Sequence, residues 1–175
     1  MFKKNIVLIG MMAAGKTTIG FKLAKELKYD FFDIDAEIEK SENKKIVDIF
    51  QDDGEKYFRN LEEKMSLIFL EKTRCIISIG GGAFLNEKIR KKITSNSLSI
   101  WLNWKIKTIL DRVKKNKRRP LALNLSSKDI AELYKKRVKF YKMSDFRVNC
   151  ENKNKNEIIK KISKLIQNEN NKHKN

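Results

Sequence analysis

The sequence predicts an α/β fold, a three-layer sandwich with a central parallel sheet and helices on both faces. Short β-rich apolar runs alternate with longer amphipathic segments along the chain, as in consecutive βαβ units. With 175 residues, the chain has the length of one domain that can bury a sizeable core. The candidate motifs directly follow predicted strands, and ligands bind beyond the carboxyl ends of strands in such sheets.

The predicted strands are short and β-rich, and they cover residues 4–9, 29–33, 75–79, 97–102 and 146–150. The predicted helices carry apolar residues at helical spacing, for example Ile19, Leu23 and Leu27 in the first. They cover residues 16–27, 36–40, 46–52, 54–72, 86–94, 105–115, 128–142 and 156–167. Residues 116–126 form a predicted loop with the only proline, Pro120, and residues 169–175 form a polar tail that is expected to fray.

The formal net charge of +18 raises the question of a nucleic-acid partner. Lysines are scattered along the chain, and aromatic residues are not interleaved with them in an RNA-binding pattern. We therefore expect a solvated basic surface and no nucleic-acid partner. The longest uncharged stretch, residues 5–15, is shorter than the roughly 20 apolar residues of a membrane helix, so no membrane association is expected.

The two cysteines, Cys75 and Cys150, do not form a disulfide framework and do not have metal-ligand spacing. Cys75 opens an apolar run, which favours a buried thiol. Because reduced cysteines are typical of cytoplasmic proteins, we expect a cytoplasmic location.

The segment GMMAAGKTT, residues 10–18, matches the phosphate-loop pattern G-x-x-x-x-G-K-[ST]. It follows a predicted strand and opens a predicted helix, as this motif requires. Backbone N–H groups then bind phosphate oxygens, Lys16 reaches the β- and γ-phosphates, and Thr17 ligates Mg²⁺. A signal peptide is the alternative, but its apolar core would be short and a helix follows without a break. The residues that we expect to bind a nucleoside triphosphate are Gly10, Ala13, Ala14, Gly15, Lys16, Thr17 and Thr18.

Acidic and glycine residues follow two further predicted strands. Asp33 and Asp35 stand two apart at a strand end, and in an extended segment they point to the same side. One carboxylate then contacts the Mg²⁺ shell and the other an acceptor hydroxyl; the alternative is that either Asp caps a helix beginning near residue 36. Gly80, Gly81 and Gly82 follow the next strand, and three consecutive glycines favour a backbone-lined pocket over a plain turn.

In their order, the phosphate loop, DIDAEIE, IVDIFQDDGEKYFRNLE, ISIGGGAF, RRPLAL and KKRVKFY resemble the shikimate kinase family. The resemblance covers about residues 5–162 and implies a P-loop fold like that of nucleoside monophosphate kinases. It implies one kinase domain over residues 1–168, with a mobile lid at about 112–126. The implied activity transfers the γ-phosphoryl group of ATP to the 3-hydroxyl of shikimate, with Mg²⁺, on the route to chorismate and the aromatic amino acids. ATP and shikimate are then the partners, and we expect a monomer.

The resemblance implies a role for each matching residue. Asp35 binds the shikimate hydroxyls and takes the transferred proton, Asp33 lies near the metal, and the three consecutive glycines touch the ring. Arg59 and Arg137 bind the shikimate carboxylate, for which planar bidentate pairing is suited. From the residues alone, a solvated surface position is the alternative for both arginines, and Arg137 lies in a run of lysines.

Two further arginines belong to the implied lid. Arg119, before Pro120, matches the arginine that reaches the transferring phosphate, so Lys16, Arg119 and Asp35 form the implied catalytic set. Arg112 matches an arginine that stacks on adenine, and an exposed helical arginine is the alternative. Closure of the lid would exclude water and stabilise charge in the transition state.

The chain departs from the family pattern at Ala13, where another glycine is usual. A methyl group is tolerable there if the residue keeps an ordinary φ. The loop at residues 152–156 also lacks a proline that relatives carry. Two other functions stay open: another small-molecule P-loop kinase, acting on gluconate or a nucleotide, and a basic P-loop protein that binds nucleic acid.

Overall fold

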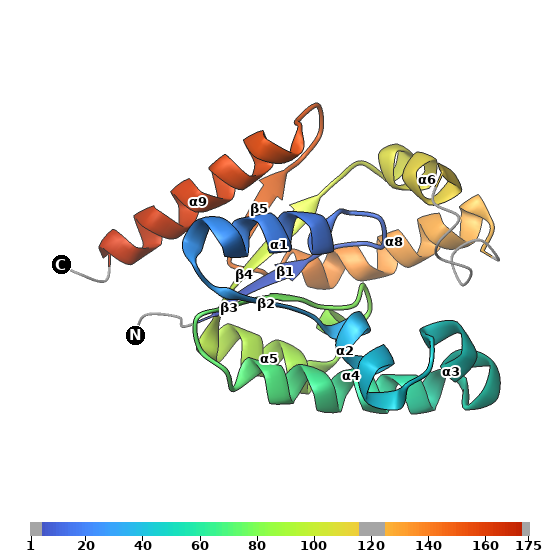
Figure 1. Ribbon diagram of the computed structural model, residues 1–175. Coiled ribbons are helices and arrows are strands. Elements are labelled where there is room, and N and C mark those ends of the chain that lie inside the picture. Colours follow the sequence, from blue (N-terminus) through green and yellow to red (C-terminus); the bar gives the residue numbers. More distant parts are fainter. Residues whose placement is uncertain (1–4, 116–124, 173–175) are drawn as a thin grey trace.

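A five-stranded parallel sheet lies at the centre of the computed structural model, which describes residues 5–115 and 125–172 (Figure 1). The strand order is β2-β3-β1-β4-β5, so the first strand of the sequence lies in the middle. The strands are β1 (Asn5–Ile9), β2 (Asp30–Asp33), β3 (Cys75–Ser78), β4 (Ser97–Asn103) and β5 (Phe146–Asn149). All four pairings are parallel, which confirms the predicted fold class.

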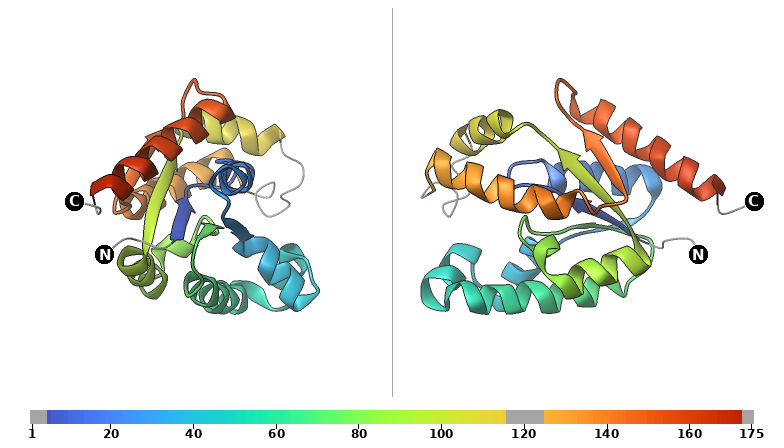
Figure 2. Two further views of the ribbon diagram at one scale, coloured as in Figure 1. Left: turned by 60° about the vertical axis from the view of Figure 1, so that its left-hand side comes forward. Right: turned by 180° about the vertical axis from the view of Figure 1, so that it is seen from behind.

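Helices cover both faces of this sheet (Figures 1 and 2). They are α1 (Lys16–Leu27), α2 (Ile34–Glu42), α3 (Ile46–Asp52), α4 (Gly54–Leu70), the 3₁₀ helix η1 (Ala83–Leu85), α5 (Glu87–Asn96), α6 (Ile106–Lys115), α8 (Ser127–Tyr141) and α9 (Lys155–Lys172). α1 and α9 pack together on one face, and α4 and α5 pack together on the other. Every residue of β1 and β4 is buried, as expected for parallel strands that helices cover on both sides.

Most element bounds differ from the prediction by at most two residues, and the main differences are at α2, α9 and η1. α2 begins at Ile34, two residues early, because the Asp33 carboxylate caps it by accepting the N–H of Asp35 and because Ile34 is buried. α9 continues past residue 167 to Lys172, so the first part of the predicted tail is helical; each added residue of an existing helix gains a backbone hydrogen bond. η1 is absent from the prediction and forms directly after the three glycines.

The strand register brings the ends of three strands together. Asp33, the last residue of β2, pairs with Ser78, the last residue of β3, and Ser78 also pairs with Leu8 in β1. The phosphate loop leaves β1 next to them. Motifs that are far apart in the sequence therefore meet at one edge of the sheet.

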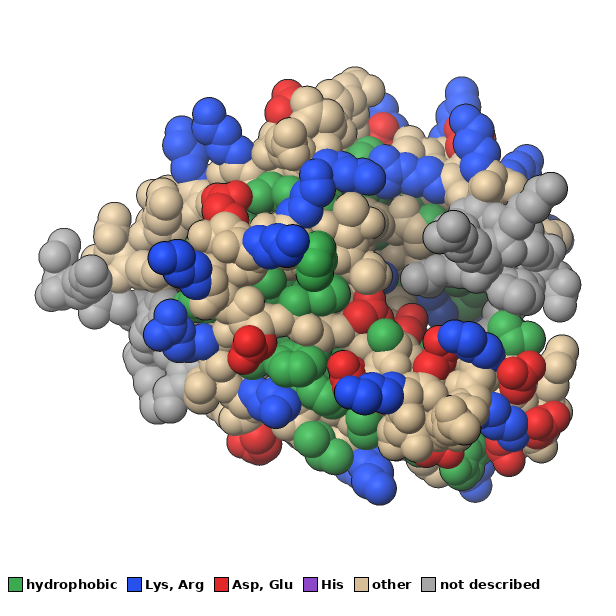
Figure 3. All heavy atoms as spheres, viewed as in Figure 1, with side chains coloured by type: hydrophobic (Ala, Val, Ile, Leu, Met, Phe, Trp, Pro, Cys, Tyr) green, Lys and Arg blue, Asp and Glu red, His purple; other side chains and the backbone are tan. Residues whose placement is uncertain are grey.

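Lys and Arg side chains are spread over the face shown in Figure 3, among acidic and uncharged side chains, rather than gathered in one patch. Such a spread is that of a solvated basic surface. Within residues 5–115 and 125–172, no helix combines the length and the apolar composition that crossing a bilayer requires.

Candidate active site

The phosphate loop connects β1 to α1 and holds its lysine inside. Lys16 is buried, and its Nζ donates to the backbone oxygens of Gly10 at 2.9 Å and Met11 at 3.1 Å. Gly10 has a φ of 151°, and a Cβ there would lie 3.0 Å from the Leu102 oxygen, so only glycine suits this close approach. The first N–H groups of α1 point into the loop, and with Lys16 they provide the positive field that phosphate oxygens need.

Ala13 departs from the expected conformation. Its φ is 59°, in the left-handed region, whereas a tolerable alanine was expected to keep an ordinary φ. The Cβ of an L-residue crowds the following carbonyl in this region, at a cost of about 1–2 kcal/mol. The loop holds the conformation because two carbonyl oxygens are bound from outside: Trp104 Nε1 donates to Ala14 at 3.0 Å, and Arg112 Nη1 donates to Ala13 at 3.4 Å.

We expect Ala13→Gly to raise the free energy of unfolding by about 0.5–1 kcal/mol, since glycine removes the crowding but gains unfolded-state entropy. Lys28→Gly is the matched control, because Lys28 also has a left-handed φ, 54°, at the C-terminus of α1. Chemical denaturation of both variants measures the effect. If Lys28→Gly stabilises the protein and Ala13→Gly destabilises it, the crowding at residue 13 is not a cost to the fold.

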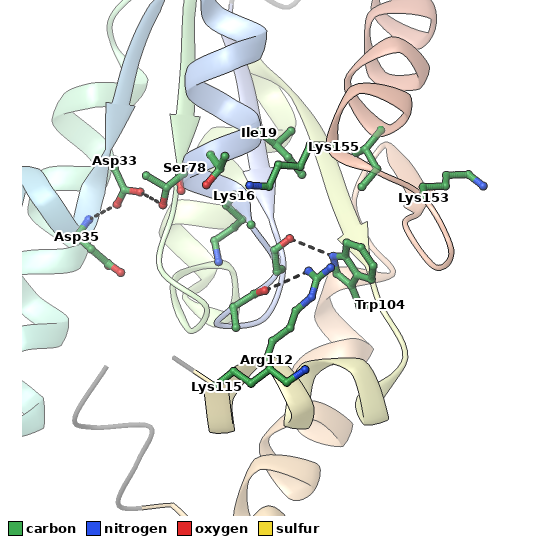
Figure 4. Close-up of a pocket in the computed structure, with 16 residues that line it drawn as sticks. Lys16, Ile19, Asp33, Asp35, Ser78, Trp104, Arg112, Lys115, Lys153 and Lys155 are labelled. Carbon is green, nitrogen blue, oxygen red and sulfur yellow. Dashed lines mark hydrogen bonds between the residues drawn. The ribbon is translucent and has the colours of Figure 1, made fainter. Parts of the chain in front are cut away.

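The acidic residues after β2 have a different geometry from the one expected. Asp33 ends the strand, but Asp35 lies in the first turn of α2, so the two do not share one side of an extended segment. Asp33 caps α2, which confirms the capping alternative, and it also accepts the hydroxyl of Thr17 in the phosphate loop at 2.5 Å. Asp33 and Asp35 both line the cavity described next, and Figure 4 shows them pointing in different directions.

A cavity of about 530 Å³ lies beside the phosphate loop (Figure 4). It is lined by Ala13, Ala14, Gly15, Lys16, Thr17, Thr18, Ile19, Asp33, Asp35, Ser78, Trp104, Arg112, Lys115, Lys153, Lys155 and Ile158. Five of these residues are Lys or Arg and two are Asp. The excess of cations suits the negative charge of a phosphate chain.

An ion pair between the half-buried Arg59 and the buried Glu62 lies on α4, next to Asp35. Arg59 Nη1 donates to Glu62 at 2.8 Å, and Arg59 Nη2 donates to the exposed Glu55 at 3.0 Å. Only 3% of the Glu62 side chain is exposed. Burial raises the pKa of the Glu62 carboxyl above its usual value, while the neighbouring Arg59 acts in the opposite direction. Glu62 thus holds the Arg59 guanidinium in a defined orientation.

Arg137 is separated from the lysines around it by burial. It is 9% exposed, whereas Lys135, Lys136 and Lys139 on the same helix are all exposed. A Cβ added to Gly81 would lie 2.9 Å from Arg137 Nη1, so the guanidinium packs directly on the glycine segment. The surface alternative is therefore wrong for Arg137.

The glycine segment after β3 is enclosed by charged side chains. A Cβ at Gly80 would overlap the Glu62 carboxylate and lie 3.1 Å from Asp35 Oδ1. A Cβ at Gly82 would lie 2.8 Å from Arg59 Nη1. The absence of side chains at these glycines is what allows two carboxylates and two guanidinium groups to approach one stretch of backbone.

The predicted site residues thus form two neighbouring sets in the structure. The phosphate-loop residues from Ala13 to Thr18 line the cavity with Asp33, Asp35 and Arg112, whereas Arg59, Arg137 and the glycines gather beside it around Asp35. Arg119 and Pro120 lie outside the described residues, so the structure describes only the two ends of the implied lid.

Sequence reasoning did not name several residues of this site. Trp104 and Lys115 line the cavity, as do Lys153 and Lys155 from the loop at residues 152–156, and the hydroxyl of the buried Tyr141 donates to the Gly81 oxygen at 2.5 Å. Trp104 carried a usable signal, because it directly follows the carboxyl end of a strand, where the other motifs lie. The lysines and Tyr141 had no local signal, since their positions depend on distant packing.

The five-stranded parallel sheet and the phosphate-loop motif between β1 and α1 place this chain among the P-loop kinases. The model of the shikimate kinase family matches residues 12–167, and the chain belongs to that family. This confirms the resemblance found in the sequence.

Three similar proteins match this chain over more than nine tenths of their length. A shikimate kinase of Persephonella marina is 42% identical over 159 residues, which are 91% of this chain and 96% of that protein. The structure of a shikimate kinase from Acinetobacter baumannii in complex with shikimate has a TM-score of 0.89 and 29% identity, and covers 95% of this chain and 94% of that chain. A shikimate kinase structure from Aquifex aeolicus has a TM-score of 0.83 and 35% identity, with coverages of 95% and 97%.

Proposed function

We propose that this protein transfers the γ-phosphoryl group of ATP to the 3-hydroxyl of shikimate, on the route to chorismate and the aromatic amino acids. The observation that carries the proposal is the convergence of Asp35, Arg59 and Arg137 on the glycine segment, next to the cavity of the phosphate loop. The guanidinium groups of Arg59 and Arg137 can bind the carboxylate of shikimate. The Asp35 carboxylate beside them can accept hydrogen bonds from its hydroxyl groups. The Acinetobacter baumannii relative, whose structure contains shikimate, supports this assignment.

The phosphate loop binds the donor. Lys16 holds the β- and γ-phosphates and spreads their charge, and the N–H groups at the start of α1 bind the remaining oxygens. Arg112 contacts the adenine side, and Arg119 of the lid reaches the transferring phosphoryl group. Positioning and charge neutralisation are the main demands of this reaction, and these residues meet them.

Thr17 and Asp33 are the residues that would hold Mg²⁺. Their oxygens lie 2.5 Å apart, and hard oxygen ligands are those that Mg²⁺ prefers. Phosphate oxygens and water would complete the coordination of the ion. When bound, the ion neutralises charge on the β- and γ-phosphates.

The acceptor side positions one hydroxyl for attack. Arg59 and Arg137 bind the carboxylate of shikimate, and Asp35 accepts the proton of the 3-hydroxyl. The 3-oxygen forms a bond to the γ-phosphorus while the bond from this phosphorus to the bridging oxygen breaks, and ADP leaves. Asp35 releases the proton to solvent after the products leave.

A coupled assay of ADP release tests the proposed function, with shikimate, quinate, gluconate and nucleoside monophosphates as acceptors. We expect the highest kcat/KM with shikimate. Gluconate or a nucleotide as the best acceptor would assign the chain to the alternative kinase. A salt-dependent RNA gel shift without shikimate-stimulated ADP release would instead support the nucleic-acid alternative.

A cytoplasmic location is part of the proposal. Cys75 and Cys150 are free, buried thiols, as expected in a reducing compartment. Burial raises the pKa of Cys150 to about 12, so this thiol stays protonated at neutral pH.

A further inference from the structure

Trp104 occupies an unusual position for a large aromatic side chain. It follows β4 directly, is only 5% exposed, and yet forms part of the cavity wall. Its backbone oxygen accepts the Tyr134 hydroxyl at 3.0 Å, which ties this turn to α8. The turn is therefore fixed from two sides, by the sheet and by a helix.

The indole N–H of Trp104 reaches the phosphate loop. It donates to the Ala14 oxygen at 3.0 Å, so it satisfies a backbone acceptor next to the strained residue Ala13. A conformation of this kind persists when its surroundings determine it. Trp104 thus contributes to the shape of the loop that binds phosphate.

The indole ring of Trp104 also contacts the Arg112 guanidinium. The guanidinium carbon lies 3.6 Å from the ring centroid, within the range of a cation–π contact, and Figure 4 shows the two side chains side by side. Arg112 Nη1 donates to the Ala13 oxygen at 3.4 Å. Trp104 and Arg112 therefore bind two consecutive carbonyl groups of the loop while they contact each other.

A guanidinium group is planar, and aromatic rings can stack on both of its faces. The indole ring covers one face of Arg112, and Arg112 lines the cavity with Ile158 and Lys155. A flat base in the cavity would then meet a cation that is already oriented, without the entropy loss of ordering a mobile arginine.

We propose that Trp104 is a positioning residue for the nucleotide: it fixes Arg112 as a flat platform for the base and holds the carbonyl groups of the phosphate loop. The inference rests on the proposed function, because ATP is the ligand concerned. It goes further in assigning nucleotide affinity to a residue that acts through Arg112 and through the carbonyl groups of the phosphate loop.

Two variants separate the two contacts of Trp104. Trp104→Phe keeps a ring under Arg112 but removes the N–H donor, and Trp104→Leu removes both. We expect KM for ATP and Kd for ADP to rise about threefold in Trp104→Phe and about tenfold or more in Trp104→Leu. KM for shikimate should change less than twofold. Calorimetry with tripolyphosphate, which has no base, should show a smaller loss in Trp104→Leu than calorimetry with ADP.

Phe69→Leu is the control for loss of a buried aromatic ring, because Phe69 packs on Phe32 and is not part of the cavity wall. Phe69→Leu should lose about as much thermal stability as Trp104→Leu, but KM for ATP should not rise. Unchanged ADP affinity in Trp104→Leu, or equal losses for ADP, tripolyphosphate and shikimate, would overturn the positioning role. A wild-type protein that binds ADP but does not phosphorylate shikimate would overturn only the proposed acceptor.

Discussion

Asp35→Asn is expected to lower kcat by about 10²–10⁴-fold, the usual contribution of a general base, with ADP binding largely kept. An amide cannot take the hydroxyl proton, although it fills the same volume. Asp35 lines the cavity and lies beside Gly80, between the proposed donor and acceptor sides. The ADP-release assay gives kcat, and calorimetry with ADP gives the affinity.

Asp33→Asn is the matched control for this variant. Asparagine is also a good N-cap, so α2 should stay intact, but the charge facing Thr17 is lost. We expect this variant to need more Mg²⁺ for half-maximal activity and to regain rate when Mg²⁺ is added. Turnover near that of the wild type in Asp35→Asn, or its rescue by Mg²⁺, would show that the role assigned to Asp35 is wrong.

Substitution of Arg59 is expected to raise KM for shikimate far more than KM for ATP. Arg59→Lys keeps a positive charge beside Glu62 but loses the planar fork, and we expect KM for shikimate to rise on the order of tenfold to hundredfold. Arg59→Ala removes the charge as well and should raise this KM further. It also removes the cation that is hydrogen-bonded to the buried Glu62 carboxylate, so we expect a loss of thermal stability as well.

Steady-state kinetics with each substrate varied in turn give KM for shikimate and KM for ATP separately. Thermal denaturation shows whether Arg59→Ala folds. Glu55→Gln serves as the control, because it removes the exposed partner of Arg59 and leaves the Glu62 contact in place. An exposed ion pair contributes about 0–1 kcal/mol, so this control should change KM for shikimate little. Equal increases in both KM values in Arg59→Lys would sink the carboxylate assignment.

The charged residues show that local sequence patterns do not predict which charged side chains are buried or how they are oriented. Arg137 and the lysines beside it look alike in the sequence, and only the helix packing buries Arg137 against Gly81. Asp33 and Asp35 were expected to share one side of a strand. Instead, α2 begins between them, at Ile34, so Asp35 lies on a helix and not on an extended segment. Asp33 favours this helix start because its side chain caps α2.

Ala13 and Trp104 show the same limit at the phosphate loop. The motif predicts the loop and its place between a strand and a helix, but the left-handed φ of Ala13 depends on how the loop closes. The Trp104 contact with Ala14 joins residues that are 90 apart in the sequence, so no local pattern reports it.

By itself, the sequence determined the order of strands and helices, the parallel sheet, the phosphate loop and the family, because hydrophobic periodicity and short motifs act over neighbouring residues. The tertiary structure decided which arginines are buried, how the two aspartates diverge, and which aromatic ring supports the loop. These properties depend on burial and on contacts between distant segments, which form only when the helices pack on the sheet.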